Sequence, residues 1–584
     1  MKLDNPHLDH FPSLVAMFFD RAERGGESPF LWHKADRAWQ PLSWRQVANQ
    51  VAALAHNLRA LGLKEGDRVV LVSENRPEFC IADLAIMAAG CITVPTYTTN
   101  TERDHQHILD NSGARAVIVS TAKLARTLMP AVMRSDAHIV ISMESLRVGQ
   151  QGEVAVHDWA PLVEGGEAHL ADAKARGLAM TRDDTACLIY TSGTGGAPRG
   201  VMQHHGAILH NAAGAAEVLV NDFGIGDEEV FLSFLPLSHA YEHSGGQFLP
   251  IMVGAQIYYS EGLEKLVSNI EETRPTIMVV VPRLFEVIRA RMIKSVEKQG
   301  KLANWMLAQA LRVGEKDYER RMGIFDRPVD VLLNRLFRPK IQKRFGGRIK
   351  ALVSGGAPLN PEIGVFFHSI GLTLLQGYGQ TEAGPVISCN RPSVGLKMDT
   401  VGPPLMNTEV KIADDGEILV RAELVMKGYW RNEAETQRVL VPDPAEPEKG
   451  PWLHTGDIGH IDGQGRIVIT DRKKDLIVND KGDNVSPQRV EGMLTLQPEI
   501  LQAMVYGDKR PHIVGILVPD PEWMIEWAEA EGLPKDLKLL REHEKFRAAL
   551  RSAVDRVNDQ LSVIEKVRKF DFADEPFTIE NEQM

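Results

Sequence analysis

Short apolar runs rich in branched side chains recur along the first two thirds of the chain, and segments with helical spacing of apolar residues separate them. The runs are RVVLVSE, CITVPTY, RAVIVS, HIVISM, ACLIYTS, TIMVVVP and IKALVSGGA. Buried strands have this composition. The helical spacing is clearest in LSWRQVANQVAALAHNLRALGL, which ends near Gly62. Strands that alternate with helices predict parallel α/β sheets.

The pattern changes after about residue 390. EVKIADDGEILVR and GHIDGQGRIVITDR place strand-like residues around DDG and DGQG turns, so each predicts a β hairpin. From about residue 473, shorter strand and helix patterns lead into a charged tail that we expect to be helical. We therefore predict an α/β fold with a large N-terminal domain, 1–472, of stacked α/β subdomains and a small β-rich subdomain. A small, mobile α+β domain, 473–584, would follow it.

The longest apolar stretch, FCIADLAIMAAGCITVP at residues 79–95, is short for a membrane span. Asp83 and Gly90 interrupt it, and Pro95 ends it. We expect a buried helix that leads into a strand. The first residues of the chain carry acids where a signal peptide has basic residues, which favours a cytoplasmic protein.

The composition is that of a globular protein, with 44% hydrophobic and 25% charged residues. The net charge of −12 argues against a nucleic-acid partner, because phosphate backbones need a basic face. The four cysteines form no CxxC pair, so buried, reduced thiols are a better interpretation than disulfides or a zinc site.

The loop YTSGTGGAPRG, residues 190–200, follows the predicted strand ACLI and cannot pack a core. Its glycines leave the backbone free to turn, and its backbone N–H groups, hydroxyls and Arg199 suit phosphate oxygens. It is not a Walker A loop, because no GK[ST] follows the glycines. A flexible surface loop is the alternative.

Three later stretches also concentrate glycine and polar residues after predicted strands: ALVSGGAPLNPE, LLQGYGQTEAGPVIS and LHTGDIGHIDGQGRIVITDRKKDLI. Each has an ordinary structural explanation as well. Tyr378 fits a turn aromatic, Glu382 a solvated acid, and Asp457 a cap. The order and spacing of these three stretches, taken together with the loop at 190–200, are harder to explain by chance.

In this order, the four stretches resemble the acyl-adenylate-forming superfamily from about residue 10 to the end of the chain. Within it, the chain resembles long-chain fatty-acid–CoA ligases through LPLSHAYEH, VPRLFEVI and a long helical insertion at about 290–348. The resemblance implies a two-step reaction with ATP, Mg²⁺ and CoA. A fatty carboxylate first forms acyl-AMP and pyrophosphate, and the CoA thiol then displaces AMP.

The resemblance also implies the site residues. Those expected to bind phosphate are Thr191, Ser192, Gly193, Thr194, Arg199 and Thr381. Those expected around adenine are Gly355, Gly356, Ala357, Gln376, Gly377, Tyr378 and Gly379, with Tyr378 stacked on the base. Asp457 and Arg472 would hold the ribose, and Glu382 would hold Mg²⁺. His239 would contact the acyl carboxylate, Lys474 would lie at a hinge, and Gly482 near the pantetheine path. Thr194, His239, Glu382 and Arg472 are the residues expected to act in catalysis.

The chain departs from the family pattern in two places. The loop usually has the form TSGTTGxPKG, and here Arg199 replaces the common lysine, which keeps the charge. Gly195 replaces a hydroxyl residue, which removes a phosphate donor and loosens the loop, so we expect weaker ATP binding. The family also carries a lysine after an FTxENGxLTPTxK-like run, whereas this sequence ends PFTIENEQM. Lys566 and Lys569 do not match that position. We expect weak adenylation by this sequence, with thioester formation from supplied acyl-AMP better preserved.

Residues 318–350 carry ten Lys or Arg against three acids, a local charge of +7. A contact with the inner membrane face is one interpretation. A solvated helix packed through its apolar face is the other, and it is the one favoured here. A homodimer is also left open. For function, the alternatives to the ligase are a fatty-acyl-AMP ligase that serves a carrier protein and a nucleotide-binding pseudoenzyme.

Overall fold

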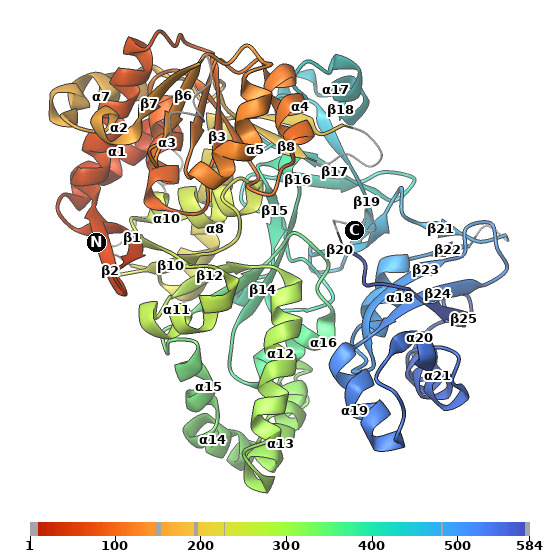
Figure 1. Cartoon of the computed structure of the whole chain (residues 1–584). Helices are drawn as coiled ribbons and strands as arrows, with labels where there is room; N and C mark the ends of the chain where they lie inside the picture. Colours follow the sequence, from red (N-terminus) through yellow and green to blue (C-terminus); the bar gives the residue numbers. More distant parts are fainter. Residues whose placement is uncertain (1–9, 147–153, 192–196, 227, 481–482, 579–584) are drawn as a thin grey trace. The chain divides into compact units, whose positions relative to one another are not determined.

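The computed structural model describes residues 10–146, 154–191, 197–226, 228–480 and 483–578 (Figure 1). The chain forms two compact units. The first comprises Met1–Lys411, Leu419–Thr455 and Ile461–Ile467, and the second Ile412–Ile418, Gly456–His460 and Val468–Met584. The α/β fold class is confirmed. The boundary at residue 472 and the mobility of the small domain stay predictions.

A seven-stranded sheet in the first unit has the order β7-β6-β5-β3-β4-β8-β9. Its strands are β3 (Arg68–Val72), β4 (Ile92–Thr96), β5 (Ala116–Val119), β6 (Ile139–Ser142), β7 (Ala155–Asp158), β8 (Thr185–Thr191) and β9 (Arg199–His204). Neighbours are parallel except β8 and β9, which form a hairpin. Successive residues of β3 contribute to different cores. Val69 and Leu71 pack with one set of helices and Val70 and Val72 with the other, because strand side chains alternate.

Helices therefore cover both faces of this sheet, as its all-apolar strands require. On one face lie α1 (Leu14–Gly25), α2 (Trp44–Ala60) and α3 (Pro77–Ala88), and on the other α4 (Glu102–Ser112) and α5 (Ala122–Val132). The expected buried helix is α3, every residue of which except Glu78 is buried. No helix in the described part of the chain is long and apolar enough to cross a membrane. All four cysteines are buried and unbridged.

An eight-stranded sheet has the order β15-β14-β13-β12-β10-β11-β1-β2. Its strands are β1 (Pro29–Ala35), β2 (Ala38–Ser43), β10 (Val230–Ser233), β11 (Gln256–Tyr259), β12 (Ile277–Val280), β13 (Ala351–Ser354), β14 (Leu374–Gly379) and β15 (Val386–Cys389). The central strands are parallel, and Ser354 pairs with Gln376. Helix α8 (His205–Phe223) contacts β15. The carboxyl ends of β13 and β14 carry residues predicted to surround adenine, and ligands of α/β sheets bind at such ends.

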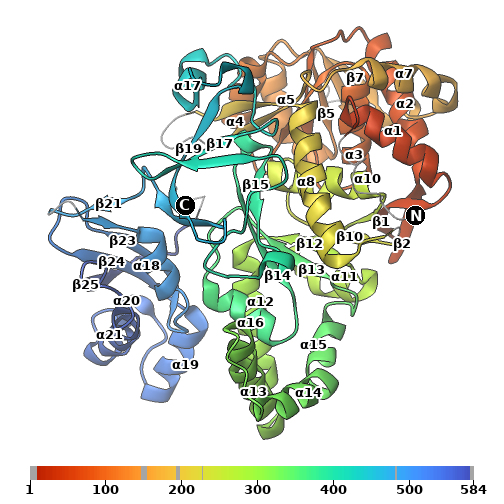
Figure 2. The same ribbon diagram turned by 180° about the vertical axis from the view of Figure 1, so that it is seen from behind.

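The expected helical insertion is present between β12 and β13. It consists of α12 (Pro282–Glu297), α13 (Lys301–Tyr318), α14 (Asp326–Leu336) and α15 (Arg338–Arg344), which extend away from the sheets of the first unit (Figures 1 and 2). Helix α13 packs on α16 (Pro361–Ser369), which precedes β14. The insertion is therefore attached to the sheet next to the strand that carries Tyr378.

Both predicted hairpins are present in a five-stranded sheet. Its strands are β16 (Glu409–Ile412), β17 (Glu417–Arg421), β18 (Leu440–Val441), β19 (Trp452–Ile461) and β20 (Ile467–Arg472). The order is β16-β17-β19-β18, and β20 pairs with β19.

The second unit contains a three-stranded sheet, β23 (Ile500–Tyr506), β24 (Ile513–Pro519) and β25 (Val567–Phe572), with α18 (Pro487–Leu494), α19 (Pro521–Glu531) and α21 (Glu544–Asn558). The prediction of a wholly helical tail was wrong for β25, which pairs in parallel with β24. Val567, Phe570 and Phe572 are buried, while charged residues between them are exposed. These charged residues interrupt the apolar pattern by which a strand is recognised in the sequence.

Gly314 allows α13 to approach α16 closely. A Cβ atom there would lie 2.4 Å from the Ser369 Cα atom, far inside contact distance. We predict that Gly314→Ala lowers the free energy of unfolding by about 1–3 kcal/mol through overpacking. Gly492→Ala, on α18 with no atom within 4 Å of the added Cβ, should stabilise by about 0.4–1 kcal/mol. Denaturant unfolding measures both; destabilisation by Gly492→Ala alone would contradict the packing argument.

Candidate active site

The loop between β8 and β9 is held by its hairpin. Thr191 pairs directly with Arg199 across the two strands. Ser192, Gly193 and Thr194, together with Gly195 and Gly196, lie outside the described residues. The structure therefore places the two ends of the expected phosphate loop, and the roles of its central residues stay predictions.

Arg199 and Glu382 both contact Tyr429. The Arg199 guanidinium lies 4.7 Å from the centre of the Tyr429 ring, and the Tyr429 hydroxyl donates a hydrogen bond of 2.8 Å to Glu382 Oε1. Burial and the neighbouring Glu382 raise the pKa of Tyr429, so its hydroxyl keeps its proton and acts as a donor. The expected phosphate cation and the expected Mg²⁺ ligand are thus brought together.

Backbone bonds hold this arrangement. Met426 N donates to Glu382 O at 2.9 Å, Met202 N to Gly428 O at 2.9 Å, and Trp430 N to Gly200 O at 2.7 Å. The Gln203 side chain also donates to Thr381 O at 2.7 Å. Strand β9, the turn at 381–383 and the segment 424–430 therefore form one connected cluster.

Sequence reasoning missed two members of this cluster, Tyr429 and Glu435. Glu435 Oε2 accepts a bond of 2.6 Å from Arg199 Nη1, so this cation already has a carboxylate partner. The only signal in the sequence is the pair of aromatic residues in KGYW after an apolar run. Nothing in that stretch indicates the strand it contacts, more than 200 residues earlier in the chain.

The residues expected around adenine lie side by side at the ends of β13 and β14. Ser354 pairs with Gln376, and residues 355–357 and Gly377–Gly379 follow directly after this pair on the two segments. Gly355 and Tyr378 are buried, whereas Gly356 and Ala357 are exposed. A Cβ on Gly355 would lie 2.7 Å from the Tyr241 ring, and one on Gly379 would lie 1.8 Å from the Pro385 carbonyl oxygen. Glycine is therefore required at both places.

Two buried polar atoms at this edge have no hydrogen-bond partner among the described residues: Ser354 Oγ and Gln376 Oε1. They belong to the directly paired positions of β13 and β14. Buried polar atoms are nearly always satisfied, so such a pair marks a place where a bound molecule can supply the bonds. Ser354 was not among the predicted site residues.

His239 precedes α9 (Ala240–Glu242) and is half-buried. Its Nδ1 atom accepts a hydrogen bond of 3.1 Å from the Tyr241 backbone N–H. Burial lowers the pKa of the ring, which favours neutral imidazole. An accepting Nδ1 leaves the proton on Nε2, so this nitrogen is the donor available to an acyl carboxylate.

A π-helix, His243–Phe248, follows directly and packs on buried polar groups. Asp83 Oδ2 accepts from His243 Nε2 at 2.9 Å and from Gln247 Nε2 at 2.7 Å. Glu242 Oε1 accepts from Ser233 Oγ at 2.6 Å, and burial raises the pKa of Glu242 to about 8. π-Helical turns often occur at functional sites.

The same segment lines an apolar cavity of about 50 Å³. Its walls come from α8, the π-helix and strands β12 to β15, with Tyr241, Ser244, Gly245, Val279 and Leu375 among the lining residues. The cavity reaches the strand that carries Tyr378. Its volume is below the roughly 300 Å³ of ordinary ligand pockets, so a long chain enters only when side chains move.

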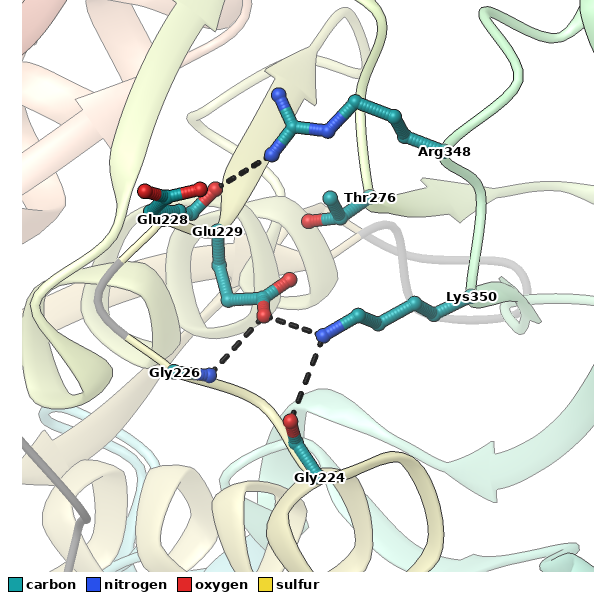
Figure 3. Close-up of a pocket in the computed structure, with 7 residues that line it drawn as sticks. All are labelled: Gly224, Gly226, Glu228, Glu229, Thr276, Arg348 and Lys350. Carbon is teal, nitrogen blue, oxygen red and sulfur yellow. Dashed lines mark hydrogen bonds and ion pairs between the residues drawn. The ribbon is translucent and has the colours of Figure 1, made fainter.

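A larger cavity, of about 410 Å³, contains none of the predicted residues (Figure 3). The two cations that line it already bond to other groups of the fold. Lys350 Nζ pairs with Glu229 Oε1 at 2.5 Å and Arg348 donates to the Glu228 carbonyl at 2.9 Å. Thr276 forms a further part of the wall. The cluster serves to join the start of β10 to the segment before β13.

In the second unit, β19 and β20 bring Asp457 and Arg472 together. The Arg472 Nε atom lies 3.7 Å from Asp457 Oδ1, and the arginine side chain is 62% exposed against 14% for the aspartate. Lys474 is exposed two residues beyond β20. Gly482 lies outside the described residues. The predicted ribose residues are therefore adjacent, and their nucleotide role stays a prediction.

No group of three or more His, Cys, Asp or Glu suited to a metal ion occurs in the described part of the chain. Glu382 alone still fits Mg²⁺, which proteins often hold through one or two carboxylates together with substrate phosphates. Its Oε2 atom takes no part in the Tyr429 bond.

Comparison with known proteins places these observations in context. A model of the family described as AMP-binding enzyme matches residues 18–430. A long-chain-fatty-acid–CoA ligase of Mycobacterium tuberculosis, FadD15, is 32% identical over 97% of this chain and 92% of its own length. Long-chain-fatty-acid–CoA ligase 6 of Mus musculus is 30% identical over 90% of this chain and 77% of its own length.

Solved structures share the fold. The anthranilate CoA ligase AuaEII, in complex with anthranoyl-AMP, superposes with a TM-score of 0.71 at 20% identity, covering 98% of this chain and 95% of that chain. ATP-bound MatB from Rhodopseudomonas palustris superposes with a TM-score of 0.65 at 21% identity, covering 96% of both chains. At these identities the likeness concerns the fold alone.

The raised pKa of Glu242 predicts a pH dependence of stability. The ordinary pKa is 4.5 and the folded value about 8, so the folded state retains a proton that the unfolded state loses. Stability from this group is complete below pH 4.5 and falls until about pH 8, by at most about 1.4 kcal/mol per pH unit. Glu242→Gln should remove this decline in denaturant unfolding, and the exposed-site control Glu164→Gln should keep it. Parallel pH profiles for wild type and Glu242→Gln would contradict the assignment.

Proposed function

The chain belongs to the AMP-binding enzyme family, and we propose that it is an AMP-forming long-chain fatty-acid–CoA ligase. In the first step, a fatty carboxylate oxygen attacks the α-phosphorus of ATP. The bond from that phosphorus to the bridging oxygen breaks, and pyrophosphate leaves. In the second step, the CoA thiolate attacks the acyl carbon, the acyl C–O bond breaks, and AMP leaves.

The observation that carries this proposal is the apolar cavity along the strand that bears the nucleotide residues. Val279 and Leu375 line it, and Tyr378 follows Leu375 on the same strand. An apolar chain in this cavity would direct its carboxylate toward the carboxyl ends of the strands. The relatives that are named long-chain-fatty-acid–CoA ligases support the same substrate class.

We assign the nucleotide to the edge formed by β13 and β14. Tyr378 would stack on adenine, and the unpartnered atoms of Ser354 and Gln376 would bond the base. Arg199 and the loop at 192–196 would bind phosphates, together with Thr381. Asp457 and Arg472 would take the ribose, with Lys474 at the hinge and Gly482 near the thiol donor.

The remaining chemistry is the neutralisation of charge, because an anion must attack a polyanion. Glu382 would hold Mg²⁺, which reduces the negative charge of the phosphates when bound. The Tyr429 hydroxyl fixes one carboxylate oxygen of Glu382 and leaves the other available. Neutral His239 would donate from Nε2 to the acyl carboxylate, which orients that group without a second full charge.

The fatty-acyl-AMP ligase and pseudoenzyme alternatives remain testable. Palmitate-dependent pyrophosphate release from ATP–Mg²⁺, measured with and without CoA, separates them. We expect palmitoyl-CoA to form in the presence of CoA. Pyrophosphate release without thioester would favour the carrier-protein ligase, and ATP binding without release would favour the pseudoenzyme. The homodimer and the cytoplasmic location stay predictions.

Glu382→Gln should lower kcat by about 10²-fold or more, because an amide binds Mg²⁺ poorly and neutralisation at the phosphates is lost. The matched control Glu448→Gln changes an exposed acid of the same kind and should leave kcat unchanged. Pyrophosphate release measures both, and thermal melting checks that each variant is folded. Unchanged kcat in folded Glu382→Gln would remove Glu382 from the proposed site.

Gly245 tests the acyl assignment. A Cβ atom there would lie 3.2 Å from Val279 Cγ2, so Gly245→Val should fill the cavity. We predict a fall in kcat/KM of at least about tenfold for palmitate relative to butyrate. Val279→Ala enlarges the same space and should not reduce palmitate preference. Equal losses for both acids in Gly245→Val would exclude this cavity as the acyl site.

A further inference from the structure

We propose that the outward face of α14, together with the turn before it, is a docking surface for a membrane that carries anionic lipid headgroups. This surface is independent of the proposed ligase function. We call it the α14 surface, and it consists of Ile324, Phe325, Val331, Leu332 and Leu336 with the basic residues around them.

The α14 surface is apolar and exposed to an unusual degree. Phe325 is 92% exposed and Ile324 81% exposed, and Val331, Leu332 and Leu336 range from 41% to 51%. Phe325 and Leu332 are seven positions apart, and Leu332 and Leu336 are four positions apart. At these spacings the three side chains share one face of the helix. Contiguous exposed apolar residues with a polar rim mark interaction sites.

The opposite face of α14 is firmly attached to the fold. Leu333 and Phe337 are buried. Asp326 pairs with Arg312 at 2.7 Å and with Lys316 at 3.0 Å, both on α13. These contacts fix which side of α14 points outward. The sequence analysis favoured a solvated helix packed through its apolar face. That interpretation explains why Leu333 is buried, but it does not explain why the apolar residues of the α14 surface are exposed.

Within residues 318–350, all of which the structure describes, the charges that take part in no ion pair are of one sign. All three acids of 318–350 are engaged: Glu319 with Arg321, Asp326 with α13, and Asp330 with Arg338 at 2.6 Å. Arg338 is buried, and Arg348 and Lys350 are used in the cluster of Figure 3, so these three cannot reach a lipid. Among the described residues no ion pair engages the exposed Arg320, Arg327, Arg335, Lys340 or Lys343.

An anionic lipid surface matches both the exposed apolar residues and the positive charge of the α14 surface. Interfacial helices place an apolar face among the headgroups and acyl chains while arginines and lysines stay with the phosphates. Arg327 and Arg335 flank the apolar residues on the same helix, and their long side chains can extend past them to the headgroups. A second copy of the chain fits less well, because a symmetric contact would bring the same cations face to face.

Vesicle flotation tests the proposal with the full-length chain. Wild type should float with vesicles made from equal parts of phosphatidylglycerol and phosphatidylcholine, and weakly with phosphatidylcholine alone. Each basic residue near an anionic surface contributes about fivefold to partitioning, so Arg320→Gln/Arg327→Gln/Arg335→Gln should bind about 100-fold more weakly. The matched control Arg103→Gln/Lys123→Gln/Arg126→Gln removes three exposed cations from α4 and α5 and should bind like wild type.

A second pair of variants tests the apolar part. Ile324→Ser/Phe325→Ser should weaken binding at low and high salt, whereas Leu178→Ser/Leu263→Ser, which alters comparably exposed leucines, should not. Thermal melting checks that every variant is folded. Equal binding by the triple-glutamine variant and its control, or no flotation of wild type, would overturn the proposal. So would a concentration-dependent dimer that Phe325→Ser disrupts, observed without vesicle binding.

Discussion

The hydrogen bond between Tyr429 and Glu382 ties together segments that lie far apart in the chain. Glu382 belongs to the turn after β14, Arg199 to the start of β9, and Tyr429 to the segment that contacts both. Tyr429 is the side chain that contacts both the carboxylate and the guanidinium, in addition to the backbone bonds that join their segments. Because the ring is buried and its hydroxyl remains protonated, the bond also fixes which oxygen of Glu382 is engaged. The orientation of the Glu382 carboxylate at the proposed phosphate end of the site therefore depends on this side chain.

The proposed acyl end of the site depends on a set of buried polar groups that contact the π-helix. The Asp83 carboxylate holds His243 and Gln247, while Glu242 is protonated near neutral pH because of its burial. Buried polar networks cost desolvation free energy, so their benefit lies in defining one conformation. Here they fix a stretch with two consecutive glycines, Gly245 and Gly246, against β12. A flexible lining could not keep His239 and the cavity in a constant relation.

Local patterns in the sequence were sufficient for seven strands of the two large sheets, namely β3, β4, β5, β6, β8, β12 and β13, and for the hairpins at 409–421 and 459–472. No pattern was recognised for β1, β7, β10 or β11, and the helical insertion was expected from the family resemblance. The roles expected for Tyr378 and Glu382 came from the resemblance to the superfamily, because the local sequence alone also fits a turn aromatic and a solvated acid. Tyr429 and Ser354 were missed, because their importance comes from pairing across strands that no local pattern predicts. β25 was missed because its exposed positions are charged. For α14 the sequence VLLNRLF has apolar residues on both faces, so only the structure decides which face is covered.

Several cations of this chain form ion pairs inside the fold. Lys350 and Arg338 hold elements together, and each meets a carboxylate within 2.6 Å. Arg199 shares this property, since Glu435 pairs with it at 2.6 Å. For Arg199 to bind phosphate, the polyanion must compete with that carboxylate. Two or more phosphate charges exceed one carboxylate charge at similar distance, so ATP can displace Glu435 whereas a single weak anion cannot. If Arg199 binds phosphate as proposed, its ion pair with Glu435 would favour a polyphosphate over a single weak anion and would hold the guanidinium in position.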